Sequence, residues 1–383
     1  KGINSLRKII SKTKKAIDKN NNKWALISFD TLDANIQLYL FHDNFIKHEN
    51  LVLKDQICFI MGKKFNQNEK IYLETINCII CKSSNYKILY TNDRHGINQQ
   101  TVMCNSCGFV YSNPRMSEES LDYFYSSNLY REVYEALNDF EHDFSERVRK
   151  VEKNIKINKP NYNKYYPQLF LDFISSLNID YKTVCEIGCG YGINLLFFKN
   201  IGKEVYGVEP SKTSVKIAID NQINIKQGFV NDLENKYDMI ILKHVFEHLY
   251  DPLKDLEKIR SHINKYLFIE VPGNFRRIAS IQNAHNFYFT ENTLHKIVTK
   301  AGFNIISTEH CKETEFIFAL YEKSKERNIN FEYSYSNEVK KIKKIYRYDN
   351  IRYAISSILK STGLYSFLLP LRKNILKILN LKS

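Results

Sequence analysis

The sequence has no long apolar run and no leader-like segment. None of its stretches approaches the roughly 18 consecutive apolar residues that a membrane span requires, and it does not open with a basic segment followed by an apolar one. We therefore expect no transmembrane segment and no secretory leader within the printed sequence. The chain starts at Lys1 and not at methionine, which leaves open whether residues precede it.

Cysteines are too few for a disulfide-rich scaffold. The chain has 8 cysteines among 383 residues, and four of them form two C-x-x-C pairs. That spacing suits a metal in a reducing compartment better than a disulfide framework, so we expect a cytoplasmic protein. Disorder is also excluded, because 43% hydrophobic and 13% aromatic residues can bury cores. The length predicts two or three compact units.

The net charge of +14 says little about partners, because heavy use of Lys, Asn, Ile and Tyr indicates AT-rich coding bias. The surplus is concentrated at the end of the chain. From Phe331 onward, 11 Lys or Arg stand against 3 Asp or Glu, a difference of 8. Apolar residues recur at helical spacing from Ile342 to Leu359, so we expect residues 331–383 to be a basic helical segment. It would either touch an anionic membrane surface peripherally or pack against the protein with a solvated face.

Residues 1–77 are expected to form a small OB-type β-barrel. Short runs alternate apolar and polar residues, and a helical piece at 42–53 interrupts them. The predicted strands lie at Trp24–Phe29, Ile36–Phe41, Gln56–Met61 and Lys70–Glu74.

This N-terminal segment resembles the OB module of the bacterial DNA polymerase III alpha chain. The matching residues are Gly2–Ile10, Trp24–Asp33, Phe41 and Leu53–Lys63. The resemblance implies a binding module without catalytic residues. OB barrels hold single-stranded nucleic acid or oligosaccharides on exposed aromatic rings and basic grooves, a role for which Trp24, Tyr39 and Phe59 are candidates unless they fill the barrel core.

Four cysteines in residues 78–115 have the spacing of a zinc site. The first pair is Cys78 and Cys81, and after a spacer of 22 residues come Cys104 and Cys107, followed by Gly108. Paired C-x-x-C knuckles place four thiolates around one tetrahedral Zn²⁺, and the glycine lets the second knuckle turn tightly. Four protein sulfurs leave no open position for water or substrate, so we expect a structural zinc and no chemistry at this site.

Residues 116–330 are expected to form a doubly wound α/β domain behind a helical lead-in capped by Ser117. From Tyr181 onward, strands alternate with helices of about 10 to 15 residues, which is typical of a parallel sheet covered on both faces. An antiparallel pair would close the sheet at a mixed edge. The predicted strands are Thr183–Ile187, Glu204–Val208, Asn224–Gln227, Met239–Leu242, Tyr266–Val271, Ile305–His310 and Glu315–Tyr321.

The first of these strands runs into a glycine-rich turn that also contains Cys189. Glycines at 188, 190 and 192 permit positive φ angles and allow a cofactor to lie against bare backbone. The next strand ends at Glu209 and Pro210, where a carboxylate can accept both hydroxyls of a ribose.

The acidic residue ahead of the turn distinguishes between cofactors. Dinucleotide folds use G-x-G-x-x-G so that a pyrophosphate meets the helix N-terminus, whereas this chain has G-x-G-x-G preceded by Glu186. A carboxylate there repels phosphate but suits the sulfonium and the amine of S-adenosylmethionine. The sequence therefore favours S-adenosylmethionine over NAD.

Four segments resemble the successive motifs of class I methyltransferases that use S-adenosylmethionine. These are Glu186–Gly192, Glu209–Ser211, Tyr237–Pro252 and Phe287–Phe303. Cys78–Arg115, with Phe124 and Tyr125, resembles the zinc-ribbon subgroup, whose better-known members are C-methyltransferases of nucleotide-linked deoxysugars. The resemblance implies cofactor contacts from Glu186, Gly188, Gly190 and Glu209, adenine contacts from Phe229 and Val230, and positions near the transferred methyl for Lys243 and His244.

Methyl transfer requires an aligned acceptor and removal of its proton, for which histidine is the natural base. In the sugar C-methyltransferases a Glu-His pair lies in a segment that Ala284–Thr290 matches here. His285 is retained, but Ala284 replaces the acid, which favours an oxygen or nitrogen acceptor over carbon. We predict His285, Tyr288 and His248 as catalytic residues. The alternative is that His285 hydrogen-bonds a loop and that His248 is structural.

Together these features predict a methyltransferase that acts on a sugar or another small metabolite in surface polysaccharide assembly. One alternative is a protein that binds or modifies nucleic acid through its N-terminal module. Another is an NAD-dependent sugar enzyme. The methyl acceptor, the atom methylated and the oligomeric state are not determined by the sequence.

Overall fold

The computed structural model divides the chain into two compact units, which are described separately below. The first unit comprises residues 1–68 and 128–140, and the second comprises residues 69–127 and 141–383. The structure describes residues 24–31, 34–41, 68, 70–93, 97–127, 129–130, 166–273, 281–311, 314–326 and 329–361.

In the first unit, the structure describes one antiparallel hairpin. Strand β1 (Trp24–Thr31) pairs with β2 (Ala34–Phe41), in a register that places Trp24 opposite Phe41. These are the first two strands expected of the OB-type barrel. The expected strand at Gln56–Met61 and the helical piece at 42–53 lie outside the described residues, and a closed barrel is not shown in the part that is described.

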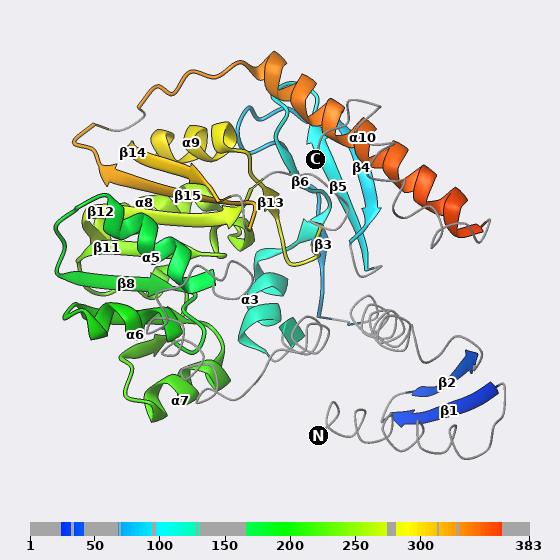
Figure 1. The fold of residues 1–383 in the computed structure, drawn as a ribbon, viewed down its shortest axis with the longest axis horizontal. Coiled ribbons are helices and arrows are strands. Elements are labelled where there is room, and N and C mark those ends of the chain that lie inside the picture. Colours follow the sequence, from blue (N-terminus) through cyan, green and yellow to red (C-terminus); the bar gives the residue numbers. More distant parts are fainter. Residues whose placement is uncertain are drawn as a thin grey trace. The chain divides into compact units, whose positions relative to one another are not determined.

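The second unit is built around a seven-stranded sheet in the order β10-β9-β8-β11-β12-β15-β14 (Figure 1). The five strands from β10 to β12 are parallel, and β15 and β14 are antiparallel to their neighbours. The bounds are β8 (Thr183–Ile187), β9 (Glu204–Glu209), β10 (Ile225–Gln227), β11 (Tyr237–Lys243), β12 (Ile263–Pro272), β14 (Phe303–His310) and β15 (Phe316–Lys323). All seven predicted strands are confirmed to within about three residues at their ends.

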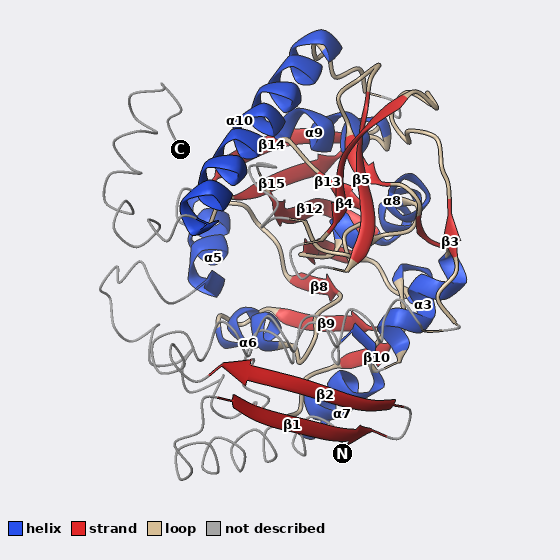
Figure 2. Cartoon of the chain, turned by 90° about the vertical axis from the view of Figure 1, so that its right-hand side faces the viewer, coloured by secondary structure: helices blue, strands red, loops and turns tan. Residues whose placement is uncertain are grey.

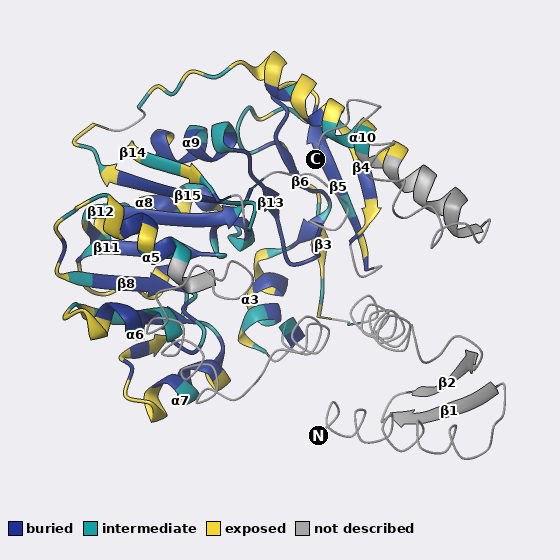
Figure 3. Ribbon diagram, viewed as in Figure 1, coloured by how far each residue is buried: buried dark blue, intermediate teal, exposed yellow. Residues whose placement is uncertain are grey.

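Both faces of the central strands are apolar because both are covered (Figure 3). One face packs against α5 (Tyr166–Ser176) and α6 (Ile193–Asn200), where Phe170 and Phe173 of α5 contact Phe268 and Phe198 of α6 contacts Phe170. The opposite face packs against α8 (Pro252–His262) and α9 (Glu291–Lys300). It also packs against the segment 78–115 that carries the four paired cysteines, called the cysteine-rich module. Helix α7 (Lys212–Asp220) covers β10 through Val215 and Ala218. Burial on two sides explains why the strands are almost continuously apolar.

The cysteine-rich module shares a sheet with the C-terminal half of the unit. This four-stranded sheet has the order β13-β6-β5-β4, and its first strand comes from residues far along the chain. The bounds are β4 (Tyr86–Asn92), β5 (Asn98–Cys104), β6 (Val110–Ser112) and β13 (Phe287–Tyr288). The pairing of Phe287 with Tyr111 therefore joins the module to the segment that carries His285.

The segments before and after this module differ in part from what the sequence predicts. The strand expected at Lys70–Glu74 is shorter, β3 (Leu73–Glu74), and it pairs with β7 (Arg115–Met116) in the second unit and not with the N-terminal hairpin. Arg115 fixes this pairing through an ion pair with Glu74 at 3.1 Å. The predicted helix after Ser117 is confirmed as α3 (Glu118–Ser126), with the Ser117 hydroxyl accepting from the Ser120 amide.

The C-terminal helix packs against the cysteine-rich module. Helix α10 (Tyr335–Ser361) begins beside β4 and β5 (Figure 1) and continues as one long helix (Figure 2). Ile342 is buried in a cluster with Leu89 and Met103, whereas Lys340 and Lys344 remain exposed. Of the two expectations for this basic segment, packing with a solvated basic face is therefore found at the start of α10. Within the described part of the chain, no helix has both the length and the apolar character needed to cross a membrane.

Two glycines with nearly equal φ angles allow a test of this packing. Gly108 has φ +79°, and a Cβ there would lie 2.8 Å from the Val339 amide nitrogen of α10, whereas Gly202 has φ +80° and open space around it. We expect Gly202→Ala to cost about 1–2 kcal/mol, the strain of a left-handed residue with a side chain. Gly108→Ala should cost clearly more, because the added methyl meets backbone. Equal losses in the free energy of unfolding, measured with denaturant, would contradict this contact.

Candidate active site and metal centre

The glycine-rich turn lies between β8 and α6, at the carboxyl end of the parallel strands. Gly188, Gly190 and Gly192 all have positive φ, at +67°, +55° and +75°. A Cβ on Gly188 would lie 2.4 Å from Val245 Cγ2, and one on Gly192 would lie 2.9 Å from Ile225 Cδ1, but one on Gly190 would meet nothing within 4 Å. The turn is therefore backed by protein at its two ends and open at its centre, where a ligand can approach the backbone.

Glu209 fixes the turn from the end of β9. Its Oε2 accepts a hydrogen bond from the Gly190 amide at 2.9 Å, and its Oε1 accepts from the Ser211 amide at 3.0 Å. The residue is 7% exposed. The side chain predicted to hold a ribose is thus held next to the predicted cofactor turn.

Glu186 is buried at the end of β8, just before the turn. The Asn194 side chain donates to its Oε1 at 2.7 Å, while Oε2 has no hydrogen-bond partner among the described residues. Burial raises the pKa of this carboxyl to about 8, against the lowering effects of Asn194 and Lys243. A buried carboxyl of this kind is stabilised when a cationic ligand binds beside it.

The ends of β11 and β12 bring further charged groups together. Lys243 Nζ lies 3.2 Å from Glu270 Oε1, and the same oxygen lies 3.0 Å from His244 Nε2. Burial lowers the pKa of Lys243 and raises that of Glu270. Burial also lowers the pKa of His244, but the carboxylates of Glu247 and Glu270 outweigh this effect, so its pKa is raised.

The helical turn η3 (Phe246–His248) places His248 beside the loop that carries His285. The His248 Nδ1 atom lies 2.8 Å from the Ala284 carbonyl oxygen and 2.6 Å from the Tyr125 hydroxyl. The two imidazole rings meet edge to face with their centroids 4.7 Å apart. Burial lowers the pKa of His248.

The β-sheet of the cysteine-rich module holds the His285 loop in place. The His285 carbonyl accepts hydrogen bonds from Ser112 Oγ at 2.7 Å and from Gln99 Nε2 at 3.3 Å. Tyr288 follows this loop in β13, but its hydroxyl donates to the Gln282 carbonyl of the loop at 3.2 Å, and burial raises its pKa to about 12. Of the three predicted catalytic residues, His248 and His285 are brought into contact, whereas the Tyr288 hydroxyl is held by the loop.

The remaining predicted cofactor residues lie around the glycine turn in different ways. The Cys189 side chain points into the core, where a Cβ on Gly207 would lie 2.6 Å from its sulfur. Phe229 is half-buried and Val230 is buried at the start of η2 (Val230–Asp232), after β10. The Pro210 carbonyl accepts from Gln227 at 3.3 Å. Because the Cys189 side chain points into the core, only the backbone of this residue can face a ligand in the turn.

Three other residues complete this region. Asn194 holds Glu186, Glu270 binds both Lys243 and His244, and Tyr125 contacts His248. Tyr125 was named from the sequence only for its resemblance to the zinc-ribbon subgroup, and the other two were not singled out. Glu270 had a recognisable signal, because it is the single acid in the apolar end of its strand. Asn194 had none, since its partner lies on another element.

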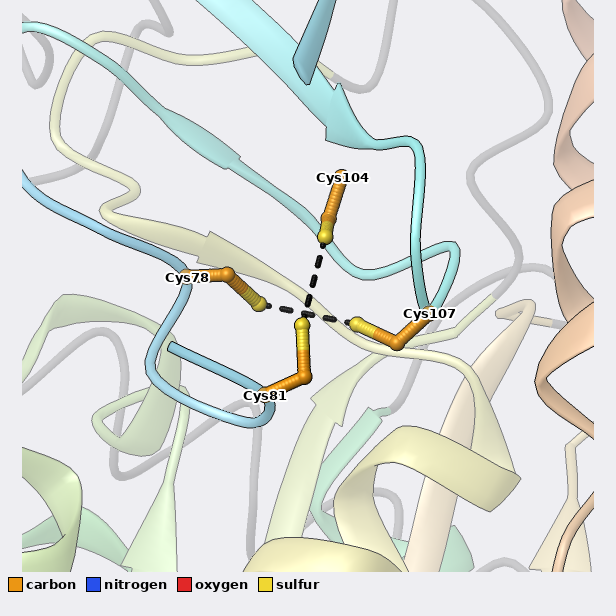
Figure 4. Close-up of side chains that lie close together, drawn as sticks. All are labelled: Cys78, Cys81, Cys104 and Cys107. Atoms are coloured by element: carbon orange, nitrogen blue, oxygen red, sulfur yellow. Dashed lines mark hydrogen bonds between the residues drawn. The ribbon is translucent and has the colours of Figure 1, made fainter. Parts of the chain in front are cut away.

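The four predicted zinc ligands converge in the second unit. Their sulfur atoms all lie within 4.8 Å of one another, with Cys78 and Cys107 at 3.5 Å and Cys81 and Cys104 at 3.5 Å (Figure 4). Zinc–sulfur bonds of about 2.3 Å place tetrahedral sulfurs about 3.8 Å apart, close to these distances. Hydrogen bonds from the thiols of Cys107 and Cys78 lower the pKa of Cys104, so this cluster already favours one thiolate. The donor set fits Zn²⁺ without rearrangement of the backbone.

The comparison with known proteins agrees with the geometry at the glycine turn. Residues 161–308, less than half of the chain, match the profile of a family described as a methyltransferase domain. No curated protein sequence matches the chain.

Solved structures similar to this chain include several methyltransferases. The magnesium protoporphyrin IX methyltransferase of Synechocystis PCC 6803, with bound SAH, is 17% identical with a TM-score of 0.38, covering 53% of this chain and 97% of its own. A methyltransferase of Clostridium acetobutylicum dependent on S-adenosylmethionine is 12% identical with a TM-score of 0.37, covering 47% and 99%. A possible histamine N-methyltransferase of Thermotoga maritima is 17% identical with a TM-score of 0.36, covering 46% and 99%.

The mixed sheet, the glycine turn and the match over residues 161–308 define the class of the protein. It is an enzyme of the methyltransferase class. Its methyl donor is S-adenosylmethionine.

The buried carboxyl of Glu186 gives a test with two readouts. Its pKa near 8 exceeds the ordinary carboxyl value of 4.5, so the folded protein binds an extra proton between these pH values and loses stability as pH rises through this window. We expect Glu186→Gln, which cannot ionise, to remove this loss and to be more stable than wild type above pH 8. The same variant should bind S-adenosylmethionine at least about tenfold more weakly, because it lacks the charge.

Thermal unfolding across pH and calorimetric titration with the cofactor measure the two effects. Glu309→Gln, at an exposed position of β14, is the matched control and should change neither. A Glu186→Gln variant that loses stability above pH 8 would contradict the raised pKa of this carboxyl, and one that binds the cofactor as wild type does would show that the carboxyl does not face the cofactor.

Proposed function

We propose that the enzyme methylates an oxygen or nitrogen atom of a sugar or another small polar metabolite. The observation that carries this proposal is the contact between His248 and His285 at the same end of the sheet as the glycine turn. Val245 packs behind Gly188 and directly precedes the helical turn that contains His248. The glycine turn and the two histidines are therefore adjacent. A methyl donor in the turn and an acceptor beside the histidines would lie next to each other.

The cofactor would contact Glu186, the three glycines of the turn and Glu209. Its amino acid portion carries a positive charge, which Glu186 would compensate, and its ribose would meet Glu209. Phe229 and Val230, which follow β10, would bracket the adenine. Lys243 and His244 would lie near the transferred methyl. The sulfonium is already activated, so the protein's task is to align the acceptor and to remove its proton.

An imidazole of His285 or His248 would take that proton. The neutral form of His248 is favoured by burial, which lowers its pKa, and a base must be neutral to accept a proton. Ala284 offers no carboxylate, and its carbonyl binds His248 instead. This arrangement supports an acceptor whose own hydroxyl or amine is weakly acidic, in contrast to the sugar C-methyltransferases, which have an acid at the matching position.

A sugar substrate in surface polysaccharide assembly is the finer part of the proposal. It is supported by the resemblance of Cys78–Arg115 to the zinc-ribbon subgroup and by the joint sheet through which that module holds the His285 loop. The cluster of four cysteines would hold a structural Zn²⁺, and its unpaired thiols suit the reducing interior of the cytoplasm.

Glu209 provides the test of the cofactor site. We expect Glu209→Gln to weaken binding of S-adenosylhomocysteine at least about tenfold, because hydrogen bonds to a charged acceptor contribute about 1.5–3 kcal/mol. Glu204→Gln, at the exposed start of the same strand, should bind as wild type does. Calorimetric titration measures both. Unchanged affinity in Glu209→Gln would contradict the proposed ribose contact.

The acceptor class is tested with the same protein and a labelled methyl donor. Transfer to nucleotide-linked sugars, and none to single-stranded DNA or RNA, is the expected result. Transfer to nucleic acid alone would overturn the sugar assignment while leaving the cofactor site intact.

Zinc in the cysteine cluster is tested by elemental analysis. Cys104→Ser should lose one equivalent of zinc per chain and unfold at a lower temperature, because the metal contributes directly to folding. Cys311→Ser, a buried cysteine outside the cluster, should keep the zinc. A Cys104→Ser protein with the zinc content of wild type would rule out this site.

A further inference from the structure

A second group of side chains able to bind a metal lies around His248 and His285, where the methyl acceptor is proposed to bind. It is separate from the four cysteines. Glu247, His248 and His285 each offer a ligand atom, and these atoms all lie within 4.8 Å of one another. Glu247 and His285 are buried, at 1% and 7% exposure. Two of the residues come from η3 and one from the loop before β13.

The hydrogen bonds of His248 favour one tautomer of its ring. Nδ1 lies 2.8 Å from the Ala284 carbonyl oxygen, which can only accept, and 2.6 Å from the Tyr125 hydroxyl, which can accept as well as donate. A hydrogen on Nδ1 satisfies the carbonyl and leaves a lone pair on Nε2, which lies 3.7 Å from Glu247 Oε1. A cation bound between these two atoms would stabilise this arrangement. A backbone carbonyl on the opposite nitrogen is also the usual orientation of a metal-bound histidine.

Glu247 has acceptor capacity that the protein does not satisfy. Its Oε2 is buried and has no hydrogen-bond partner within the described ranges, while its Oε1 lies 3.3 Å from His244 Nδ1. An unsatisfied buried carboxylate oxygen is destabilising, because a charged group that leaves water loses its hydration. Such an oxygen can accept from a water molecule or bind a cation.

The backbone around His285 is held firmly enough to keep a ligand in place. The His285 carbonyl accepts hydrogen bonds from Ser112 and Gln99. Two residues further on, Phe287 of β13 pairs with Tyr111 of β6. The His248 and His285 rings meet edge to face, and one nitrogen of each lies within 4.8 Å of the other and of a Glu247 oxygen.

We propose that Glu247, His248 and His285 bind a divalent transition-metal cation. Two imidazoles and one carboxylate suit Zn²⁺, Co²⁺ or Fe²⁺ better than Mg²⁺ or Ca²⁺, which prefer oxygen ligands. Ligand bonds of about 2.0–2.1 Å place neighbouring ligand atoms about 3–4 Å apart, slightly closer than the 4.8 Å within which the three atoms lie. Three protein ligands leave positions open, in contrast to the cysteine cluster, so an acceptor with a hydroxyl or carboxylate could bind the ion directly.

The identity of that acceptor rests on the proposed function, but the metal site itself does not. A nitrogen that binds the ion cannot also serve as the base. Metal binding and the role of base are therefore alternatives for the ligating nitrogens of His248 and His285, and a count of bound metal separates them.

The test is a metal count on the full chain loaded with Zn²⁺ or Co²⁺ and freed of loosely bound ions. We expect two ions per chain in wild type and one each in His285→Ala, Glu247→Gln and Cys104→Ser. In the absorption spectrum of the cobalt-loaded protein, Cys104→Ser should lack the sulfur-to-cobalt charge-transfer bands. His285→Ala and Glu247→Gln should retain those bands. The matched control is His262→Ala, which removes a half-buried histidine at the end of α8, outside both groups of ligands. This variant should keep both ions.

Binding of S-adenosylhomocysteine to the same proteins verifies the fold and separates the two proposals. His285→Ala and Glu247→Gln should bind it as wild type does. One ion per chain in wild type, with the same single ion in both variants, would overturn the second metal site. Two ions in wild type without any cofactor binding would leave the metal site standing and would contradict the proposed function.

Discussion

The cost of burying carboxylates governs the architecture of this end of the sheet. Glu186, Glu247 and Glu270 are all at most 1% exposed, and each lies at or just beyond the carboxyl end of a central strand. Taking a carboxylate out of water costs free energy unless a cationic or hydrogen-bonding partner replaces the water. Glu270 Oε1 meets Lys243 and His244, and Glu186 Oε1 accepts from Asn194. The Oε2 atoms of Glu186 and Glu247 have no hydrogen-bond partner among the residues that the structure describes. The incomplete pairing is consistent with a site whose remaining partners are ligands.

Most of the α/β domain could be predicted from the sequence because its signals are local. The strands at Thr183–Ile187 and Tyr266–Val271 are apolar runs between turn residues, and Gly188, Gly190 and Gly192 mark a bend that only glycine tolerates well. The cysteine spacing likewise predicted a cluster that the structure assembles. In each of these cases, the residues that make the feature are close in the sequence or of a rare type.

What the sequence could not provide was the pairing between distant segments. The two-residue strand Phe287–Tyr288 has no periodicity of its own and becomes a strand only because Tyr111 and Val110 are beside it. The same applies to Leu73–Glu74, which was assigned to the N-terminal barrel but pairs with Arg115–Met116. The contact of Tyr125 with His248 joins elements 123 residues apart. Such contacts depend on tertiary structure, which overrides local preference.

The closure of the cysteine module's sheet by β13 has a consequence for how this protein can evolve. A module attached by a linker can be exchanged between proteins as a cassette, but here the outer strand is supplied by the loop that also carries His285. Replacing the module would expose an unpaired edge and release the loop at the same time. Changes in the strand β6 and in the acceptor loop are therefore expected to be inherited together, as matched pairs.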